Sequence, residues 1–183
     1  MSQTKVVLDG DEMRRTLVRI AHEIVERHEG PGPLALVGIQ RRGAVLASRL
    51  HALLTDLLGE DIPVGTVDIS FYRDDLTTRP DMPEVHATEI GFPIDGATVV
   101  IVDDVLYTGR TVRAAIEALF AYGRPARVQL AVLADRGHRE LPIRPDYVGK
   151  NLPTARAERV NVHVAEVDGV DEVTISAGAE VTA

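Results

Sequence analysis

The stretch VVIVDDVLYTGRT, residues 99–111, constrains the fold more than any other part of the sequence. Thr98–Val102 is β-branched at every position, which is typical of a parallel strand covered on both faces. Tyr107–Gly109 is predicted to form a turn, and Arg110–Tyr122 a helix. Val128–Leu133 then predicts the next strand. A strand, a helix and a strand in succession favour a right-handed βαβ unit within a doubly wound sheet.

The rest of the chain continues this alternation and shows no internal repeat or linker. With 183 residues, 45% of them hydrophobic, the chain is expected to form one α/β domain over residues 1–183. Further helices are predicted at 9–29 and 44–58, and strands at 34–39, 64–71, 160–164 and 172–175. We expect a long loop at 72–93, irregular chain at 135–153 and a frayed tail at 176–183.

Composition excludes several classes of protein. The absence of cysteine excludes disulfides, zinc–thiolate sites, iron–sulfur clusters and thiol catalysis. The six histidines show no metal-ligand spacing, so no directly bound metal is expected. No apolar run approaches the ~20 residues of a membrane span, and the N-terminus lacks a signal-peptide core. We therefore expect a cytoplasmic protein that does not contact membranes.

Two carboxylates and a phosphate-binding turn follow the central strand. Asp103 and Asp104 are expected at its carboxyl end, where open α/β sheets bind ligands. Thr108, Gly109 and Thr111 lie at the start of a helix, whose amide N–H groups and dipole favour an anion. A phosphorylated sugar fits this pattern, with its hydroxyls or a bridging Mg²⁺ at the carboxylates. The alternative is a solvated turn that follows a chance Asp–Asp pair.

A nucleoside-triphosphate site is a rival interpretation of the same pair, and the rest of the sequence rules it out. It would need a glycine-rich loop ending in Gly-Lys-Ser or Gly-Lys-Thr. The chain has one Gly-Lys, Gly149-Lys150, which is followed by Asn151.

The stretch at 99–111 resembles the phosphoribosyl-diphosphate (PRPP) binding motif of type I phosphoribosyltransferases. SFYRDDL at 70–76, LADRGHRELP at 133–142 and YVGKNLPT at 147–154 narrow the resemblance. Together they are similar to the bifunctional pyrimidine operon regulators that are also uracil phosphoribosyltransferases, over residues 5–175. The resemblance implies a mainly parallel, doubly wound sheet flanked by helices. It also implies a small C-terminal hood at about 135–175 and a mobile loop at about 72–93.

The resemblance assigns the catalytic parts. Asp103 and Asp104 would meet the ribose hydroxyls, and Arg73 would arrive on the mobile loop. Arg73 could instead be a surface arginine paired with Asp74 or Asp75. Mg²⁺ would bridge the substrate and not be held by the protein alone. The substrate-binding set is the pyrophosphate loop (Arg41, Arg42, Gly43), the 5′-phosphate loop (Val105, Leu106, Tyr107, Thr108, Gly109, Arg110, Thr111) and the base pocket (Arg136, Val160). Family members often have Lys and Thr where this chain has Gln40 and Arg41.

The implied activity converts uracil and PRPP into UMP and diphosphate. A purine phosphoribosyltransferase shares the PRPP motif and stays an alternative. A nucleotide-sensing RNA-binding regulator with little catalytic activity is a second one. The resemblance also implies a homo-oligomer, either a dimer or a larger assembly.

The resemblance further implies binding to pyrimidine-operon mRNA, strengthened by UMP. A formal net charge of −8 argues against a polyanion partner. However, segments 14–27 and 135–159 each carry +2, which leaves −12 for the remainder. The RNA surface maps onto Arg19, His22, Arg27, His138, Arg139, Arg144 and Lys150, while Val18 replaces a family threonine. The alternative is that these residues form ordinary surface ion pairs.

Overall fold

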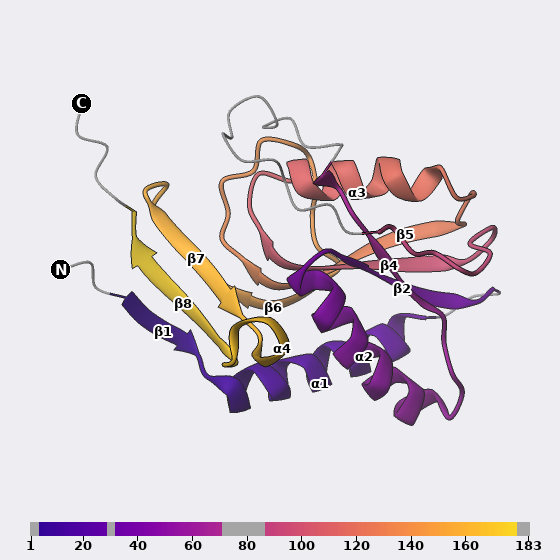
Figure 1. Ribbon diagram of the computed structural model, residues 1–183, viewed down its shortest axis with the longest axis horizontal. Coiled ribbons are helices and arrows are strands. Elements are labelled where there is room, and N and C mark those ends of the chain that lie inside the picture. Colours follow the sequence, from indigo (N-terminus) through magenta and orange to yellow (C-terminus); the bar gives the residue numbers. More distant parts are fainter. Residues whose placement is uncertain (1–3, 29–31, 71–86, 179–183) are drawn as a thin grey trace.

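The computed structural model describes residues 4–28, 32–70 and 87–178. Its central sheet has five parallel strands in the order β3-β2-β4-β5-β6, and a second, antiparallel sheet has the order β1-β8-β7 (Figure 1). The central strands are β2 (Leu34–Ile39), β3 (Val64–Val67), β4 (Thr98–Leu106), β5 (Arg127–Asp135) and β6 (Tyr147–Asn151). The second sheet contains β1 (Thr4–Leu8), β7 (Glu158–His163) and β8 (Glu172–Ala177), and together with α4 (Ala165–Asp168) it is here called the hood. Unlike the hood predicted at about 135–175, it includes β1 and leaves out β6, which belongs to the central sheet. The helices are α1 (Gly10–Arg27), α2 (Arg42–Leu58), α3 (Arg110–Phe120) and α4 (Ala165–Asp168).

The central sheet is covered on both faces, as the β-branched run predicts. Along β4, Val100 and Val102 pack with α1 and α2, whereas Val99 and Ile101 pack with α3. Figure 1 shows α1 and α2 on one side of the sheet and α3 on the other. Because successive side chains of a strand point to opposite faces, a strand buried on both must be apolar at every position. The predicted doubly wound fold is confirmed.

Two helices begin and end where local sequence signals place them. In α1, Asp9 accepts a hydrogen bond from Glu12 N (2.8 Å), and Glu12 accepts one from Asp9 N (2.9 Å), so the two residues form a capping box. Helix α2 ends at Gly59, which adopts a left-handed conformation with φ of 70°. Both ends lie within two residues of the predicted boundaries.

Segment 135–153 differs from its prediction as irregular chain, because β6 lies within it and pairs with β5. Only Tyr147 of β6 is buried, so the strand lacks the apolar run of the inner strands. Gly149 is required because a Cβ there would lie 2.3 Å from Leu133 O of β5 and 2.7 Å from Thr16 Cγ2 of α1. This glycine lets both the β5 backbone and α1 approach the edge strand, although in sequence it looks like a turn residue.

Three smaller differences concern the edge strands β1 and β3 and the C-terminal strand β8. Strand β1 was not predicted, β3 ends at Val67 and not at residue 71, and β8 continues to Ala177 within the tail predicted to fray. Most of the predicted loop at 72–93 lies outside the described residues. Within the part of the chain that is described, no helix combines the length and the apolar character needed to cross a membrane.

Candidate functional site

The acid pair lies near the carboxyl end of β4. The Asp103 side chain is buried, with the residue 6% exposed, and Asp104 is half-buried. Asp103 Oδ1 accepts a hydrogen bond from Asp104 N (2.9 Å), and Asp104 Oδ1 accepts one from Val105 N (2.8 Å). Asp104 Oδ2 accepts no hydrogen bond from any described residue. One carboxylate oxygen at this sheet edge is therefore available to a ligand.

The predicted pyrophosphate loop is in contact with this pair. Gly43 is the second residue of α2, and a Cβ at this position would lie 2.6 Å from Val102 O and 3.2 Å from Asp103 Cα. Only glycine allows α2 to approach β4 this closely. Gln40 N donates to Val67 O (2.9 Å), and the Gln40–Arg41 peptide bond is cis. The structure therefore places the loop between β2 and α2 directly beside the acid pair.

The Arg42 guanidinium is held by the hood. Its Nε and Nη2 donate to Asp168 Oδ2 and Oδ1 at 3.0 and 2.7 Å, and Asp168 Oδ2 also accepts from Val164 N. Hydrogen bonding to Asp168, together with the charges of Asp168 and Asp104, raises the pKa of Arg42. The same pair lowers the pKa of Asp168. Arg42 therefore lies near Asp104, while two nitrogens of its guanidinium are bound to Asp168 of α4. Arg41 is exposed at the N-cap position of α2.

The predicted 5′-phosphate loop is shorter than expected. Strand β4 continues to Leu106, whose side chain is 1% exposed in the core on the α3 side. Leu106 can therefore offer a ligand its backbone only, and Val105 is also a strand residue. The turn itself is Tyr107–Gly109, with φ of 95° at Gly109. Arg110 and Thr111 then open α3, so their amide groups lie at the helix N-terminus.

A neighbouring segment supports this turn. Thr108 O accepts hydrogen bonds from Glu140 N (2.9 Å) and Leu141 N (3.1 Å). The Arg110 Nε donates to Glu140 Oε2 at 3.1 Å. A Cβ at Gly109 would lie 3.3 Å from Ile143 Cδ1. Residues 140–143 therefore pack against the turn and hold it in place through hydrogen bonds and an ion pair.

Of the two residues predicted for the base pocket, Arg136 contacts the start of the strand that carries Val160. Arg136 is 8% exposed, with its guanidinium 4.1 Å from the centre of the Tyr107 ring. Its Nη2 donates to Glu158 O (2.8 Å) and Ala155 O (3.3 Å), at the start of β7. Val160 is half-buried in β7. Arg136 thus links the phosphate turn to the strand that carries Val160. Arg73, the predicted catalytic arginine, lies outside the described residues.

The first group of predicted RNA-binding residues lies along α1 and β6. Arg19 Nη2 donates to Gly149 O (2.6 Å) and Val148 O (3.2 Å), and Arg19 Nη1 pairs with Glu23 at 2.6 Å. Arg27 donates to Asp146 O (3.1 Å) and stacks on Tyr147, 5.4 Å from its ring centre. Lys150 Nζ donates to Val7 O (2.9 Å). His22 is exposed on the same helix.

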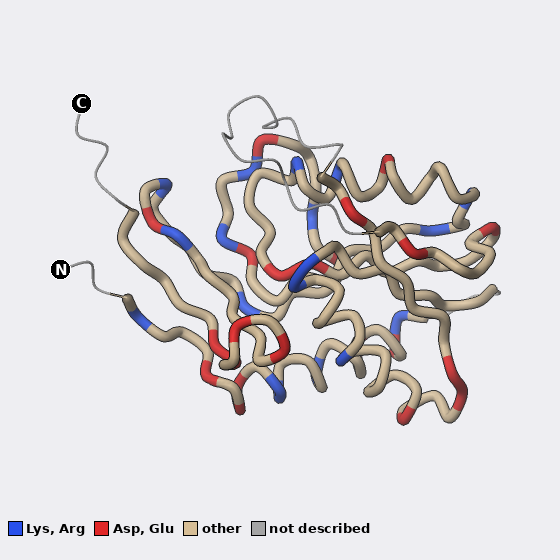
Figure 2. The backbone as a smooth tube through the Cα atoms, viewed as in Figure 1, with Lys and Arg blue, Asp and Glu red and all other residues tan. Residues whose placement is uncertain are grey.

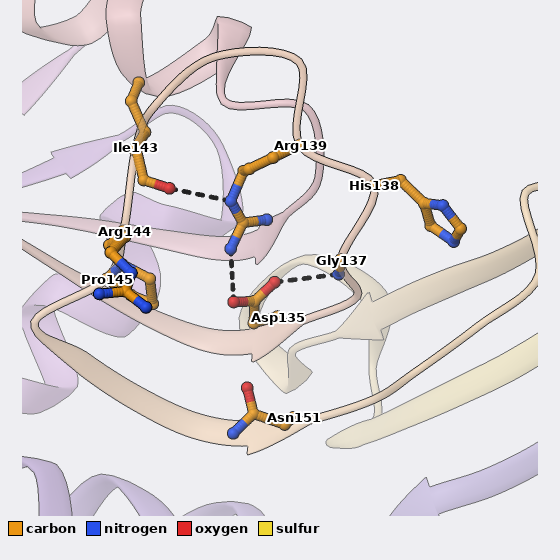
Figure 3. Close-up of a pocket in the computed structure, with 8 residues that line it drawn as sticks. All are labelled: Asp135, Gly137, His138, Arg139, Ile143, Arg144, Pro145 and Asn151. Carbon is orange, nitrogen blue, oxygen red and sulfur yellow. Dashed lines mark hydrogen bonds and ion pairs between the residues drawn. The ribbon is translucent and has the colours of Figure 1, made fainter.

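The second group, His138, Arg139 and Arg144, lines a hollow of about 540 Å³ beside the ends of β5 and β6 (Figure 3). Arg139 bridges three elements: its Nη2 pairs with Asp135 (2.5 Å), its Nε donates to Ile143 O and its Nη1 to Tyr107 O. His138 Nε2 lies 2.5 Å from Thr154 O. Arg144 is exposed. The sequence analysis predicts these three residues as parts of one RNA surface, but it does not predict the hollow.

Comparison with known proteins agrees with this geometry. The phosphoribosyl transferase domain family matches residues 3–166. The Bifunctional protein PyrR of Roseiflexus sp. (strain RS-1) is 61% identical over 172 residues, which cover 93% of this chain and 94% of that protein. The Bifunctional protein PyrR of Pelotomaculum thermopropionicum is 58% identical over 174 residues, which cover 95% of this chain and 96% of that protein. The chain belongs to the PyrR family of phosphoribosyltransferases.

Solved structures support the fold of this PyrR-family chain. A hypoxanthine phosphoribosyltransferase from Trypanosoma cruzi, in complex with the product IMP, has a TM-score of 0.72 at 21% identity and covers 98% of this chain and 96% of its own. A hypoxanthine phosphoribosyltransferase from Staphylococcus aureus has a TM-score of 0.68 at 20% identity, with 92% and 90% covered. At this identity the likeness concerns the fold alone.

Sequence reasoning missed the ionic cluster that joins the hood to α2 in this PyrR-family chain. Arg49 pairs with both Glu166 and Asp171, next to the Arg42–Asp168 pair. Figure 2 shows acidic residues gathered at α4 and at the turn before β8. The partners are more than 115 residues apart in sequence, so no local pattern could have paired them. A conspicuous signal was still present, because EVDGVDE at 166–172 is dense in acids.

Proposed function

We propose that the chain transfers the phosphoribosyl group of PRPP to N1 of uracil, which forms UMP and releases diphosphate. We further propose that it binds the mRNA of pyrimidine genes in a UMP-dependent manner. The observation that carries the enzymatic part is the juxtaposition of three elements at one sheet edge. Asp103 and Asp104 lie near the carboxyl end of β4, Gly43 packs so closely that a Cβ on it would lie 3.2 Å from Asp103 Cα, and the phosphate turn continues from β4. PRPP needs these three sites together.

The residues suggest how each part of PRPP is bound. The 5′-phosphate would occupy the turn at 107–109, where amides of the α3 N-terminus favour an anion. Asp104, with an available oxygen, would accept hydrogen bonds from the ribose hydroxyls. The loop at Arg41–Gly43 would bind the diphosphate with guanidinium and amide donors. The substrate would thus be held across β4 with its C1 exposed to the incoming base.

The reaction breaks the bond between ribose C1 and the diphosphate oxygen and forms a bond from C1 to uracil N1, which loses its proton. Positive charge that develops at C1 and the ring oxygen would be stabilised by Asp103 and Asp104. These carboxylates are also suitable donors for Mg²⁺, which protein sites hold through one or two carboxylates and substrate phosphates. No group of three or more acidic or histidine side chains suited to a metal occurs among the described residues. Bound Mg²⁺ would neutralise charge on the departing diphosphate.

Incubation with uracil, PRPP and Mg²⁺ tests the enzymatic part. UMP and diphosphate should form in equal amounts. Parallel reactions with hypoxanthine, guanine and adenine test the purine alternative, which would give purine nucleotides and no UMP. If no base is consumed while UMP still binds, the protein is a nucleotide sensor and not an enzyme.

The RNA part is supported by how the basic residues are held. Arg27 and Lys150 donate to backbone carbonyls, which orient a cation without neutralising its charge. Arg144 forms no hydrogen bond or ion pair with any described residue. Relatives that match nearly the whole chain are called bifunctional, which agrees with a second role. A titration with a pyrimidine-operon leader RNA, with and without UMP at two salt concentrations, should give a UMP-dependent affinity that weakens steeply with salt.

Two further expectations concern where and how the protein acts. The substrates are metabolites of the cytoplasm, so the protein is expected there. Family resemblance also favours a homo-oligomer. Sedimentation equilibrium should give a mass at least twice the 19.9 kDa of one chain.

A further inference from the structure

We propose that the hollow beside β5 and β6 holds one unpaired base of the bound RNA, and that the Asn151 amide hydrogen-bonds to the edge of this base. The proposal rests on the RNA-binding part of the proposed function and assigns a site to a residue outside the predicted RNA surface. The hollow has a volume of about 540 Å³. Small-molecule sites usually measure about 300–1,000 Å³, so one nucleotide fits. The lining residues are Asp135, Gly137, His138, Arg139, Ile143, Arg144, Pro145 and Asn151.

The charges of the hollow suit an anionic polymer. Asp135 is the carboxylate of the lining, and it is neutralised by Arg139 at 2.5 Å and by a hydrogen bond from Gly137 N at 3.0 Å. Arg144 adds a positive charge that no described acid compensates. A nucleotide that enters would therefore meet a net positive environment and no exposed negative charge.

Asn151 is placed to read a base. It is the last residue of β6 and lies opposite Asp135 in the sheet, with its side chain exposed at the rim. Its amide forms no hydrogen bond with the described residues, so both its donor and its acceptor are available. Base edges present neighbouring donors and acceptors, which an asparagine amide matches in pairs. Figure 3 shows Asn151 across the hollow from Arg144, whose guanidinium plane can stack on a base.

Two further residues of the predicted RNA surface, Arg27 and Lys150, are tied to the chain next to the hollow. Arg27 is held by Asp146 O, two residues beyond Arg144, and Lys150 directly precedes Asn151. RNA that followed these cations along β6 would pass the mouth of the hollow. In double-stranded RNA the bases are stacked and paired, so only a loop or bulge nucleotide could enter.

The test uses hairpin RNAs with a randomised eight-nucleotide loop, selected by the wild-type protein with saturating UMP. In the selected hairpin, each loop nucleotide is replaced in turn by an abasic residue. We compare the wild type with Asn151→Ala, Asn151→Asp and Arg156→Ala. Arg156 is exposed on the turn before β7, outside the hollow, and Arg156→Ala lowers the net charge by one, as Asn151→Asp does, so it controls for the charge change in that variant. Thermal unfolding checks that each variant is folded.

We expect one abasic position to weaken wild-type binding by about 5- to 100-fold, the range of a single two-point base contact. Asn151→Ala should lose a similar factor with the intact hairpin and show no further loss at that position. Asn151→Asp should bind more weakly still. The hollow assignment is overturned if Asn151→Ala binds like the wild type, or if its loss is the same with every abasic hairpin. If the wild type enriches no hairpin, the RNA-binding function itself fails, and the hollow assignment fails with it.

Discussion

Replacement of Arg49 by methionine would test whether the ionic cluster around α4 secures the hood. The Arg49 Nε donates to Glu166 Oε1 (3.0 Å), while Nη1 and Nη2 donate to Asp171 Oδ2 (3.0 Å) and Oδ1 (2.8 Å). A further ion pair joins Nη2 to Glu166 Oε2. Asp171 also accepts from Ala165 N, so it ties α4 to the turn before β8. Methionine keeps an apolar stem of similar length and removes the charge.

The expected loss of unfolding free energy lies between two known limits. Exposed ion pairs contribute about 0.2–1 kcal/mol, and removal of one partner of a buried pair costs about 3–5 kcal/mol. The side chain of Arg49 is 22% exposed and that of Asp171 is 27% exposed, whereas Glu166 is 50% exposed and contributes little. We therefore expect Arg49→Met to destabilise the protein by about 2 kcal/mol at pH 7.

The loss should depend on pH in a defined direction. Hydrogen bonds from Arg49 lower the pKa of both Glu166 and Asp171 in the folded wild type. A lowered folded pKa means that the stabilisation is fully present above the unfolded values, about 4.3 for Glu and 3.9 for Asp, and disappears as the pH falls through the folded values. The difference between wild type and Arg49→Met should therefore be constant from pH 8 to about 5.5 and shrink below about pH 4.

Urea unfolding of both proteins across this pH range measures the difference. Arg113→Met is the matched control, since Arg113 pairs with Glu117 at 2.9 Å on an exposed helix face. This control should lose about 0.5 kcal/mol or less. The reasoning is refuted if Arg49→Met loses no more than Arg113→Met, or if its loss does not change down to pH 3.5.

Three further predictions concern function. Asp104→Asn should lower kcat for UMP formation by about 100-fold or more, because a carboxylate that stabilises charge at C1 is lost; an unchanged kcat would contradict its role. Gly43→Ala should raise KM for PRPP, because its Cβ would lie 2.6 Å from Val102 O, while Gly91→Ala, with nothing within 4 Å, should behave as wild type. Arg19→Ala and Arg144→Ala should each reduce the salt slope of RNA binding by about 1, and unchanged slopes in both would remove these residues from the RNA surface.

The parts of the fold that could be predicted are those specified by neighbouring residues. β2 is apolar at all six positions and matches its prediction residue for residue. The edge strand β6 could not be predicted, because its partners, β5 and α1, decide which of its residues are buried. Tyr147 is 1% exposed, but Gly149 and Lys150 follow it and interrupt any local pattern. Burial on one side by a distant helix leaves no periodic signal in a five-residue strand.

In the candidate site, too, the sequence predicts the parts formed by neighbouring residues but not the contacts between distant ones. The acid pair and the phosphate turn occupy consecutive positions, so a single motif predicts them. Arg42 was predicted as a diphosphate ligand, and the structure places it beside the acid pair but in a two-point contact with Asp168, 126 residues away. A carboxylate and a phosphate both suit the guanidinium fork. The sequence can therefore indicate the chemistry of Arg42, while only the fold gives the identity of its present partner.

The choice of partner also explains how a chain of net charge −8 can present a basic surface. Arg42 and Arg49 pair with carboxylates of α4 and the turn after it, which cancel their charges beside the hood. Arg27 and Lys150 are anchored instead by backbone carbonyls, which have a dipole but no charge to offset the cation. Both kinds of contact cost similar side-chain entropy, but a carboxylate partner cancels the positive charge and a carbonyl partner leaves it in place. Net charge counts both kinds of basic residue equally, so it cannot predict whether such a protein binds RNA. A better guide is the number of cations on one face, such as Arg27, Lys150 and Arg144, whose charge no described carboxylate offsets.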